Sequence, residues 1–502
     1  MIMRMVSSKI SHILVLFVLF SQLFIYGCKE SDRSTIAMGL NTSPVNLDPR
    51  YATDAISYRV SRLIYKSLID FDEKYHVIPQ LAVWQKLSPT HYRFILGEKY
   101  REFHDGSKLS SEDVKATYDS VLNSNNVSPH RGSIAMIKSI EIVDFDTIDF
   151  KLSYPDPLFP GRCVIGILPK KFIYKKHDFS REPIGSGPIK ILYWENDENL
   201  KLKRISDNKI IELITLKDPI VRVLKLLKGD IDLIQGNLPP EVITWLGKKQ
   251  YLNVEKKIGN TFTYIGFNLE DPIVGNILIR NAIAHAIDRE SIIKYVMSSS
   301  ARKAGSLLPP EHWASNSNLS GFKYNPKKSK KFLKDAGYDG LTPLKLIYKT
   351  SNDPFRLRLA TIIQKQLESI GIEIEIRSYD WGTFYGDIKE GRFQMYSLSW
   401  VGLKMPDIFY YIFHSDSVPP YGANRGRFKD AKVDEILDLV RSETSLNKQA
   451  IYYKNLQEYL MRSLPYIPLW YEDNVLISKS NIKGYKLSTD GNFDSLIYIQ
   501  ND

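Results

Sequence analysis

The sequence predicts an α/β protein with two lobes that face each other across a cleft, together with a β-rich stretch. The first observation is a strand–helix–strand pattern, which occurs three times and is typical of right-handed βαβ units and mainly parallel sheets. The second is its distribution, because one copy lies before residue 250 and two lie after residue 340. The third is size: 502 residues, 43% of them hydrophobic, suffice for two or three domains that each bury a core.

The first copy of the pattern has clear helix boundaries. Residues 210–214 predict a strand. Asp218 followed by Pro219 predicts the N-cap and first turn of a helix, and Gly229 predicts its end. Residues 231–235 then predict the second strand.

The second copy repeats these signals. Residues 344–348 predict a strand, Asp353 and Pro354 begin a helix, and Gly371 ends it. Residues 372–376 alternate isoleucine with glutamate, which indicates a strand with one polar face.

The third copy lacks the proline and predicts a helix over 381–390 and a strand over 393–400. In open α/β sheets, ligands bind beyond the carboxyl ends of the strands. The site is therefore expected after Gln235, after Ile376 and after Trp400. Two lobes with facing strand ends commonly close on a ligand by hinging.

Other stretches do not follow the strand–helix–strand pattern. Residues 70–182 are rich in predicted strands (92–96, 140–143 and 147–152) and contain a helix that Ser110 begins. Helices are also expected within 278–297 and 326–336.

Composition excludes several classes of protein. Aromatic residues make up 12% and charged residues 25% of the chain, which excludes a disordered tail protein, a collagen-like fibre and a coiled coil. The net charge of +11 arises from 68 basic against 57 acidic residues and is spread evenly. Such a diffuse surplus is typical of a solvated basic surface, and no nucleic-acid partner is expected.

The N-terminal residues predict export. Arg4 and Lys9 precede an apolar run over 13–26 that only Ser21 and Gln22 interrupt. A run of this length, at about 1.5 Å per residue, is too short for a hydrocarbon core of about 30 Å, and no later segment reaches 18 apolar residues. A basic start followed by a short apolar run is typical of a secretory signal peptide.

The end of that run, Phe24 to Cys28, resembles a lipoprotein box. Cleavage before Cys28 would remove residues 1–27, and lipid on Cys28 would anchor the protein through a tether over 28–33. The alternative is a signal peptide without lipidation, in which the cysteine occurs by chance.

No catalytic or metal-binding pattern stands out. The nine histidines have no chelating spacing, and Gly185–Pro188 lacks the Lys-Ser/Thr of a phosphate-binding loop. His104–Gly106 is explained by a turn before a capped helix, and Cys163 by a buried thiol. We expect no enzyme, no cofactor and no bound metal.

Motifs in order along the chain then indicate a family. They are Asn46–Pro49, Pro79–Ala82 with Trp84, Tyr92–Phe94, Phe103–Gly106, Ser111–Val114, Gly185–Pro188, Asn268, Ile279–Ala282, Ala286–Arg289, Leu308–Pro310 and Asp335–Tyr338. With them the chain resembles the family 5 extracellular solute-binding proteins, the oligopeptide, dipeptide and nickel receptors of ABC importers, over roughly residues 36 to 500. Most of these motifs, including Arg280 and Asp288–Arg289, are expected to be scaffold.

The resemblance implies a two-lobed periplasmic-binding-protein fold of class II type with an inserted α+β domain and a hinged cleft. Its parts are lobe I (34–66, 183–257 and 470–502), the inserted domain (67–182) and lobe III (258–469). It also implies a monomeric lipoprotein of the periplasm or cell envelope that binds a peptide or peptide-like solute and delivers it to ABC permease subunits.

Site residues follow from the resemblance where the pattern matches. Trp400 matches, but Leu403 stands where peptide-binding members have an Asp for the peptide's α-ammonium, so ordinary recognition of that ammonium is not expected. Glu472 is a candidate substitute carboxylate, with a surface glutamate as the alternative. Asp407 matches a later Asp of the family's Asp-Pro pair.

The remaining candidates come from their positions. Arg425 lies in a Gly-rich loop with Arg427, and this loop suits a carboxylate or phosphate, with a solvated loop as the alternative. The complete set of expected ligand contacts is Thr53, Asp54, Tyr264, Asn268, Trp400, Gly402, Leu403, Asp407, Arg425, Trp470, Tyr471 and Glu472.

Two alternatives to a peptide receptor remain open. The same fold can serve a different solute, such as an opine-like compound, a metallophore or a nickel complex. The chain can also be an envelope lipoprotein with an adhesive or structural role.

Overall fold

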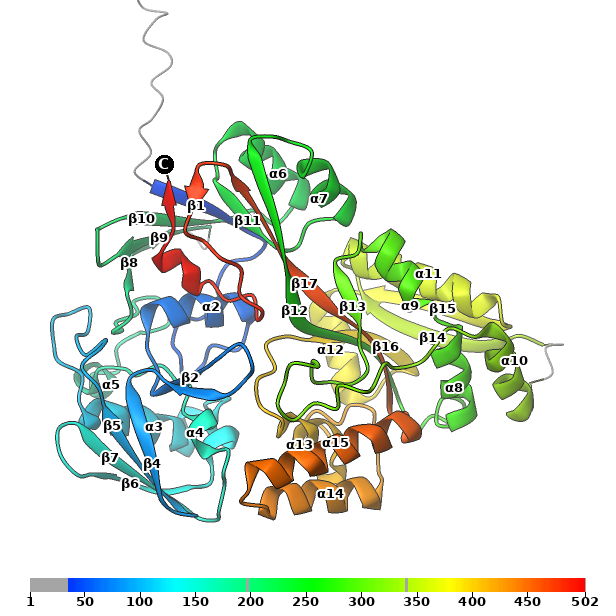
Figure 1. The fold of residues 1–502 in the computed structure, drawn as a ribbon, viewed down its shortest axis with the longest axis horizontal. Coiled ribbons are helices and arrows are strands. Elements are labelled where there is room, and N and C mark those ends of the chain that lie inside the picture. Colours follow the sequence, from blue (N-terminus) through cyan, green and yellow to red (C-terminus); the bar gives the residue numbers. More distant parts are fainter. Residues whose placement is uncertain (1–34, 196–197, 339–341, 502) are drawn as a thin grey trace, which may run out of the picture.

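The computed structural model describes residues 35–195, 198–338 and 342–501 (Figure 1). The predicted signal peptide, Cys28 and the tether therefore lie outside the described residues. Within the described ranges, no helix has the length and apolar character needed to span a membrane.

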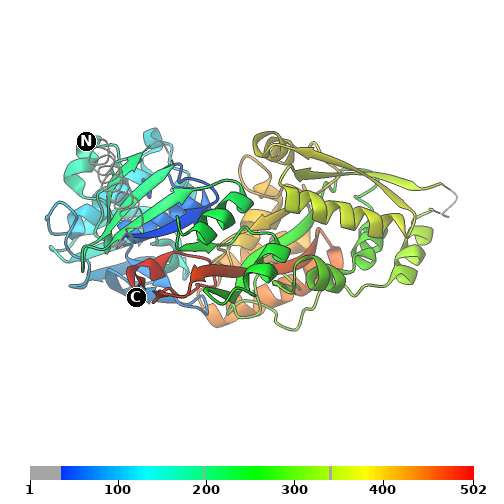
Figure 2. The same cartoon turned by 90° about the horizontal axis from the view of Figure 1, so that it is seen from above.

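One mixed sheet runs through both halves of the molecule, which lie side by side along its long axis (Figure 2). Its strand order is β15-β14-β16-β12-β17-β11-β1-β10-β9-β8, and β13 pairs with β17. The strands are β1 (Thr35–Leu40), β8 (Ile189–Glu195), β9 (Asn199–Arg204), β10 (Ile210–Thr215), β11 (Leu233–Gln235), β12 (Leu252–Phe267), β13 (Ala301–Lys303), β14 (Leu344–Ser351), β15 (Ile372–Tyr379), β16 (Met395–Trp400) and β17 (Tyr466–Lys479).

Two long strands join the halves. β12 has 16 residues and β17 has 14, and they pair with each other while passing from one half to the other (Figure 1). We call the half with β1 and β8–β11 lobe I and the half with β14–β16 lobe III. The two-lobed α/β fold expected from the sequence is confirmed.

The expectation of mainly parallel sheets is wrong for the sheet as a whole. Parallel pairs occur at β1–β10, β1–β11, β14–β15 and β14–β16, where the predicted βαβ units lie. The two connecting strands are antiparallel to each other and to their neighbours β11 and β16. A strand that returns between lobes must run against its partner, and this geometry is not visible in a local pattern.

The predicted helix boundaries of the βαβ units are confirmed, except that the second helix ends at Glu368 rather than at Gly371. Asp218 accepts hydrogen bonds from the backbone N–H groups at the start of α6 (Pro219–Lys228), and Gly229 ends that helix with a φ of 87°. Asp353 caps α11 (Pro354–Glu368) in the same way. The third helix, α12 (Trp381–Glu390), ends at Gly391.

The stretch 278–297 is not continuous helix. It contains α8 (Ile277–Ala286), the single turn α9 (Arg289–Ser291) and the π-helical turn η3 (Ile292–Val296). Asp288 Oδ1 accepts a hydrogen bond from the Ser291 N–H at 3.0 Å. This side chain therefore caps the start of α9, just after α8 has ended.

Two arginines near this break serve the scaffold, as expected. The Arg280 guanidinium donates to backbone carbonyls that include Leu464 O at 2.8 Å. The Arg289 guanidinium donates to the carbonyls of Ala304 and Phe322, both at 2.7 Å.

The inserted domain holds a separate antiparallel sheet in the order β4-β5-β7-β6. Ser110 and Asp113 form the capping box of α3, whose inner face packs on this sheet. Cys163 is fully buried in the same core, and burial raises the pKa of its thiol. The elements here are β2 (Ile69–Phe71), β3 (Val77–Pro79), β4 (Ala82–Ser88), β5 (His91–Leu96), α3 (Ser111–Leu122), η1 (Ser124–Asn126), η2 (Arg131–Ile134), β6 (Ile137–Ile142), β7 (Thr147–Leu152), α4 (Phe159–Arg162) and α5 (Lys170–Tyr174).

The sheet of lobe III has a hydrophobic core on each face. Ile265 and Trp470 belong to one core with α8 and α11, which we call the α11 face. Phe262 and Tyr471 belong to the other, with α13–α15, which we call the α15 face. The remaining elements are α2 (Ala55–Ile64), α7 (Pro240–Leu246), α10 (Pro326–Asp335), α13 (Ile408–Phe413), η4 (Ser415–Ser417), α14 (Ala431–Ser442), α15 (Leu446–Ser463), β18 (Ile482–Lys483), η5 (Asp494–Ile497) and β19 (Gln500–Asn501).

Candidate ligand-binding site

A cavity of about 490 Å³ lies between the two lobes. Asn41, Lys217 and Gly236 line it from lobe I, and they follow β1, β10 and β11 respectively. Asp353 and Arg356 line it from lobe III, at the start of α11. The position after Gln235 is therefore at the cavity, as the strand-end rule predicted.

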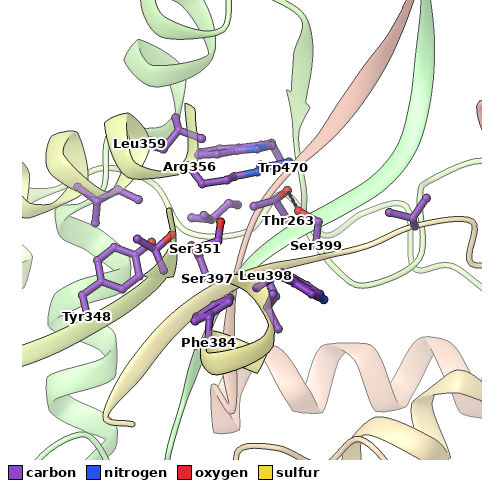
Figure 3. A pocket seen from close by; sticks show the side chains of 15 residues that line it. Thr263, Tyr348, Ser351, Arg356, Leu359, Phe384, Ser397, Leu398, Ser399 and Trp470 are labelled. Atoms are coloured by element: carbon purple, nitrogen blue, oxygen red, sulfur yellow. Dashed lines mark hydrogen bonds between the residues drawn. The ribbon is translucent and has the colours of Figure 1, made fainter. Parts of the chain in front are cut away.

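A second pocket of about 230 Å³ lies in lobe III on the α11 face (Figure 3). Arg356 and Trp470 lie on one side of this pocket and Phe384 on the other, with Tyr348 at one end. Hydroxyl groups gather around the apolar lining, from Thr263, Thr350, Ser351, Ser397 and Ser399. Such a pocket can take an amphipathic group, because its apolar lining removes carbon from water while its hydroxyls satisfy polar atoms.

The other two predicted strand-end positions border this pocket. Trp381 follows β15 and Val401 follows β16, and both line the pocket. Residues that follow strands of the second and third copies of the strand–helix–strand pattern thus line the same pocket.

An ion pair lies where the two cavities adjoin. Arg356 lines both, and its Nη1 and Nη2 lie 2.6 Å and 3.0 Å from the two carboxylate oxygens of Glu472. Thr263 Oγ1 donates to Glu472 Oε1 at 2.6 Å and lies 2.7 Å from Ser399 Oγ. Burial disfavours the Glu472 carboxylate, but the charge and hydrogen bonds of Arg356 outweigh burial, so the pKa of Glu472 is lowered.

Glu472 is therefore not a free carboxylate, because Arg356 binds both of its oxygens. Arg356 was not among the contacts expected from the sequence. Its signal was its position, since it follows the predicted N-cap Asp353 by three residues at the end of a predicted strand.

The loop after Trp400 joins lobe III to the rest of the molecule. The Lys404 ammonium lies 2.9 Å from Asp490 of lobe I and 3.9 Å from Asp70 of the inserted domain. Asp407 pairs with Arg162 of the inserted domain at 2.5 Å. Burial opposes ionisation of Asp490, yet the Lys404 charge and the Ser488 hydrogen bond prevail and lower its pKa.

Leu403 and Gly402 have packing and backbone roles in this loop. Leu403 is 9% exposed and belongs to the core on the α15 face. Gly402 has a φ of 69°, in the left-handed region that favours glycine.

Arg425 lies on the α15 face, beside Trp400. Its guanidinium donates to Tyr264 Oη at 3.1 Å and to Tyr385 Oη at 3.2 Å. The guanidinium carbon lies 4.7 Å from the centroid of a Trp400 ring, a cation–π contact.

Several predicted contacts lie away from these cavities. Thr53 is exposed, and Asp54 caps α2 by accepting from the Ser57 N–H at 2.8 Å. The Asn268 amide donates to the Gly391 carbonyl at 3.1 Å. Tyr471 is fully buried, and its hydroxyl lies 2.6 Å from the Ser306 carbonyl.

No group of three or more histidine, cysteine, aspartate or glutamate side chains suited to a metal ion occurs in the part of the chain that the structure describes.

Comparison with known proteins gives the family. The model of bacterial extracellular solute-binding proteins, family 5, middle part, matches residues 77–419. The chain belongs to this family. The resemblance noted from the sequence motifs is thereby confirmed, and the family is one of solute-binding proteins rather than enzymes.

Relatives match along nearly the whole chain. The oligopeptide-binding protein AppA of Bacillus subtilis is 26% identical over 491 residues, which cover 91% of this chain and 90% of AppA. The dipeptide-binding protein of Escherichia coli is 24% identical over 488 residues, with 88% and 90% covered.

Solved structures share the fold. NikZ from Campylobacter jejuni in complex with Ni(L-His) has a TM-score of 0.81 at 25% identity, with 93% of this chain and 100% of NikZ covered. DppA from Helicobacter pylori in complex with the peptide STSA has a TM-score of 0.79 at 26% identity, with 93% and 98% covered.

Proposed function

We propose that this protein captures a peptide or peptide-like solute between lobes I and III and delivers it to the permease of an ABC importer. The observation that carries the proposal is the cavity of about 490 Å³ between the lobes, which adjoins the lobe III pocket at Arg356. Similar proteins support it, since AppA is an oligopeptide-binding protein and DppA was solved with a peptide.

The geometry suits an extended ligand. Its main chain would lie between the lobes, and one apolar or amphipathic side chain would enter the 230 Å³ pocket. A ligand that touches both lobes favours the closed arrangement, because it gains contacts there that the open arrangement lacks. Ion pairs between the lobes, such as Lys404–Asp490, also stabilise the closed arrangement.

Recognition of a free α-ammonium is not part of the proposal. Leu403 replaces the carboxylate that peptide-binding members of the resembled family use there. Two carboxylates near the lobe boundary are already paired, Glu472 with Arg356 and Asp490 with Lys404. Peptides with a free and with an acetylated N-terminus are therefore expected to bind alike.

The test is ligand-induced stabilisation of the full chain by a panel of peptides of two to nine residues, each in free and N-acetylated form. A ligand at 100 times its Kd stabilises the folded protein by about 2.7 kcal/mol, which is readily measured as a rise in Tm. A panel without any shift would count against the peptide function. A strong preference for free amines would show that another carboxylate replaces the one missing at Leu403.

A non-peptide solute is the second candidate, and Leu403 is the observation that favours it. Native mass spectrometry of the purified protein separates the two, because a tightly bound cargo is retained and weighed. A peptide mass supports the first candidate, and the mass of an opine-like compound or a metal complex supports the second.

The proposal includes a lipid anchor on Cys28 and a monomeric protein in the periplasm or cell envelope. Its basis is the sequence alone, namely a basic start, an apolar run and a box that ends in cysteine. Cys28→Ser is expected to move the protein from the membrane fraction to the soluble fraction. An unchanged membrane fraction would refute lipidation.

A further inference from the structure

Arg425 is a buried cation without an acidic partner in the described parts of the chain. Only 8% of the residue is exposed, and no Asp or Glu lies within ion-pair distance of it there. Arg427, two residues on in the same loop, differs in this respect, because its Nε lies 3.6 Å from Glu270. A buried charge that lacks a counter-ion is costly, so its surroundings need an explanation.

Two other buried arginines of this fold, Arg280 and Arg289, are compensated by backbone carbonyls. Arg280 donates to four, at Leu464, Val274, Gly275 and Ser463. Arg289 likewise donates to carbonyls from several segments. The Arg425 guanidinium has five N–H groups, and it donates instead to phenol oxygens, those of Tyr264 and Tyr385. Arg425 therefore does not join backbone segments as Arg280 and Arg289 do.

Aromatic rings hold the guanidinium in place. Its carbon lies 4.7 Å from a Trp400 ring centroid and 5.3 Å from that of Tyr385. Cation–π contacts contribute about 0.5–2 kcal/mol each, which fixes the cation without neutralising it. Phenol oxygens that accept from the guanidinium keep their own O–H groups. The hydroxyls of Tyr264 and Tyr396 lie 3.3 Å apart, so one of these two donates to the other and one can donate to a further acceptor.

A crevice of about 30 Å³ adjoins this group. Arg425, Trp400, Tyr264 and Tyr396 are among its lining residues. One water molecule needs about 10–15 Å³ of such space, so the crevice has room for the oxygens of one carboxylate. Trp400 is also the last residue of β16, directly before the loop that reaches lobe I through Lys404.

We propose that Arg425 binds an anionic group of the solute, specifically a carboxylate, with Trp400 and the tyrosine hydroxyls around it. The inference rests on the proposed function and names the class of solute within it: one that presents a carboxylate and needs no free ammonium. A carboxylate matches the fork of a guanidinium in a way that a neutral amide does not. The carboxylate can be the C-terminus of a peptide or an acidic side chain.

The test uses tetrapeptides that differ in one carboxylate at a time, with isothermal titration of the full chain. One arm compares a free C-terminus with its amide, and the other compares an aspartate side chain with asparagine. In one of the two arms, loss of the carboxylate is expected to weaken binding to the wild-type protein about 10- to 150-fold. The arm that responds identifies the source of the carboxylate.

Variants then assign the effect to Arg425. Arg425→Met is expected to bind acid and amide alike, and Arg425→Lys to retain part of the preference because it keeps the charge but not the fork. Arg427→Met is the matched control from the same loop and is expected to keep the full preference. If Arg425→Met fails to fold by circular dichroism, the wild-type comparison and Arg425→Lys still decide.

Failure of the two proposals can be told apart. Wild-type protein that binds acids and neutral analogues equally in both arms would overturn the carboxylate site and leave the peptide function standing. An undiminished preference in Arg425→Met would also overturn it. Wild-type protein that binds none of these tetrapeptides, and none of the peptides of two to nine residues in the panel, would overturn both.

Discussion

The ammonium of Lys404 and the carboxylate of Asp490 lie 2.9 Å apart and belong to different lobes. Both side chains are mostly buried, with 13% and 15% of their surface exposed. Asp70 lies 3.9 Å from the same ammonium and is itself paired with Arg62 at 2.7 Å. The loop that follows Trp400 is thus held to lobe I and to the inserted domain by charge.

Lys404→Met is expected to shift the protein towards an open arrangement. The substitution keeps the apolar stem and leaves Asp490 without its nearest cation, which typically costs about 2 kcal/mol or more. Small-angle X-ray scattering should show a larger radius of gyration without ligand, and peptide affinity should fall about tenfold or more. Lys365→Met, which breaks the Lys365–Glu368 pair within α11, is the control. Equal radii and affinities in the two variants would contradict a role in closure.

Burial of His312 is expected to make the folded protein less stable in mild acid. Its Nε2 lies 3.1 Å from the Lys404 carbonyl and its ring centroid lies 5.0 Å from that of Tyr75. Burial lowers the pKa of His312 from 6.5 to about 4. The unfolded chain therefore binds more protons between these values, and stability decreases as the pH falls from about 6.5 to about 4.

The size of this effect follows from the shift. Each pKa unit corresponds to about 1.4 kcal/mol, so His312 contributes a fall of about 2–3 kcal/mol across that window. His312→Asn should flatten the dependence by that amount in chemical denaturation at pH 7, 5.5 and 4. His104, His130 and His285 also have a lowered pKa, so the difference between variant and wild type is the relevant quantity. Parallel curves for the two proteins would refute the assignment.

Glu472→Gln is expected to destabilise the folded protein by about 1–3 kcal/mol. The substitution removes the bidentate partner of Arg356 and one acceptor of Thr263, in a partly buried place. Urea denaturation measures the loss. Glu373→Gln is the control, because the Lys345–Glu373 pair on the same sheet is exposed and is worth less than about 1 kcal/mol. Equal stabilities for the two variants would show that the Arg356 pair is weak.

Ser351→Phe is expected to block the lobe III pocket. Ser351 ends β14 and points into the pocket, so a phenyl ring there occupies volume that a ligand side chain would use (Figure 3). Affinity for peptides with a large apolar side chain should fall at least tenfold, while glycine-rich peptides keep theirs. Ser378→Phe on the neighbouring strand β15 is exposed and serves as the control. A uniform effect on all peptides would contradict a side-chain pocket.

The βαβ units and the place of the site could be predicted because their signals are local. Asp218, Asp353 and the glycines after each helix decide the helix ends within a few residues. The strand-end rule then gives the position of both cavities from topology alone. Gly236 lines the cavity between the lobes, and Trp381 and Val401 line the lobe III pocket.

What could not be predicted depends on pairs that are distant in sequence. Arg356 and Glu472 are 116 residues apart, and Lys404 and Asp490 come from different lobes, so neither pair leaves a local pattern. The surroundings of Arg425 come from β12, α12 and β16 together. The break at Asp288 was missed because an apolar helical period continues across it, and only the side-chain hydrogen bond to Ser291 reveals it.

The pairing of β12 with β17 bears on how much work opening requires. Its register shifts between Lys257 and Thr261 and again between Thr263 and Tyr264, at the point where the two strands pass between the lobes. At those irregularities the ladder is already interrupted, so bending there sacrifices few backbone bonds. This part of the β12–β17 ladder therefore bends easily, while each lobe stays rigid. The energy that resists opening then comes from side-chain contacts at the lobe boundary. Single substitutions there can change it.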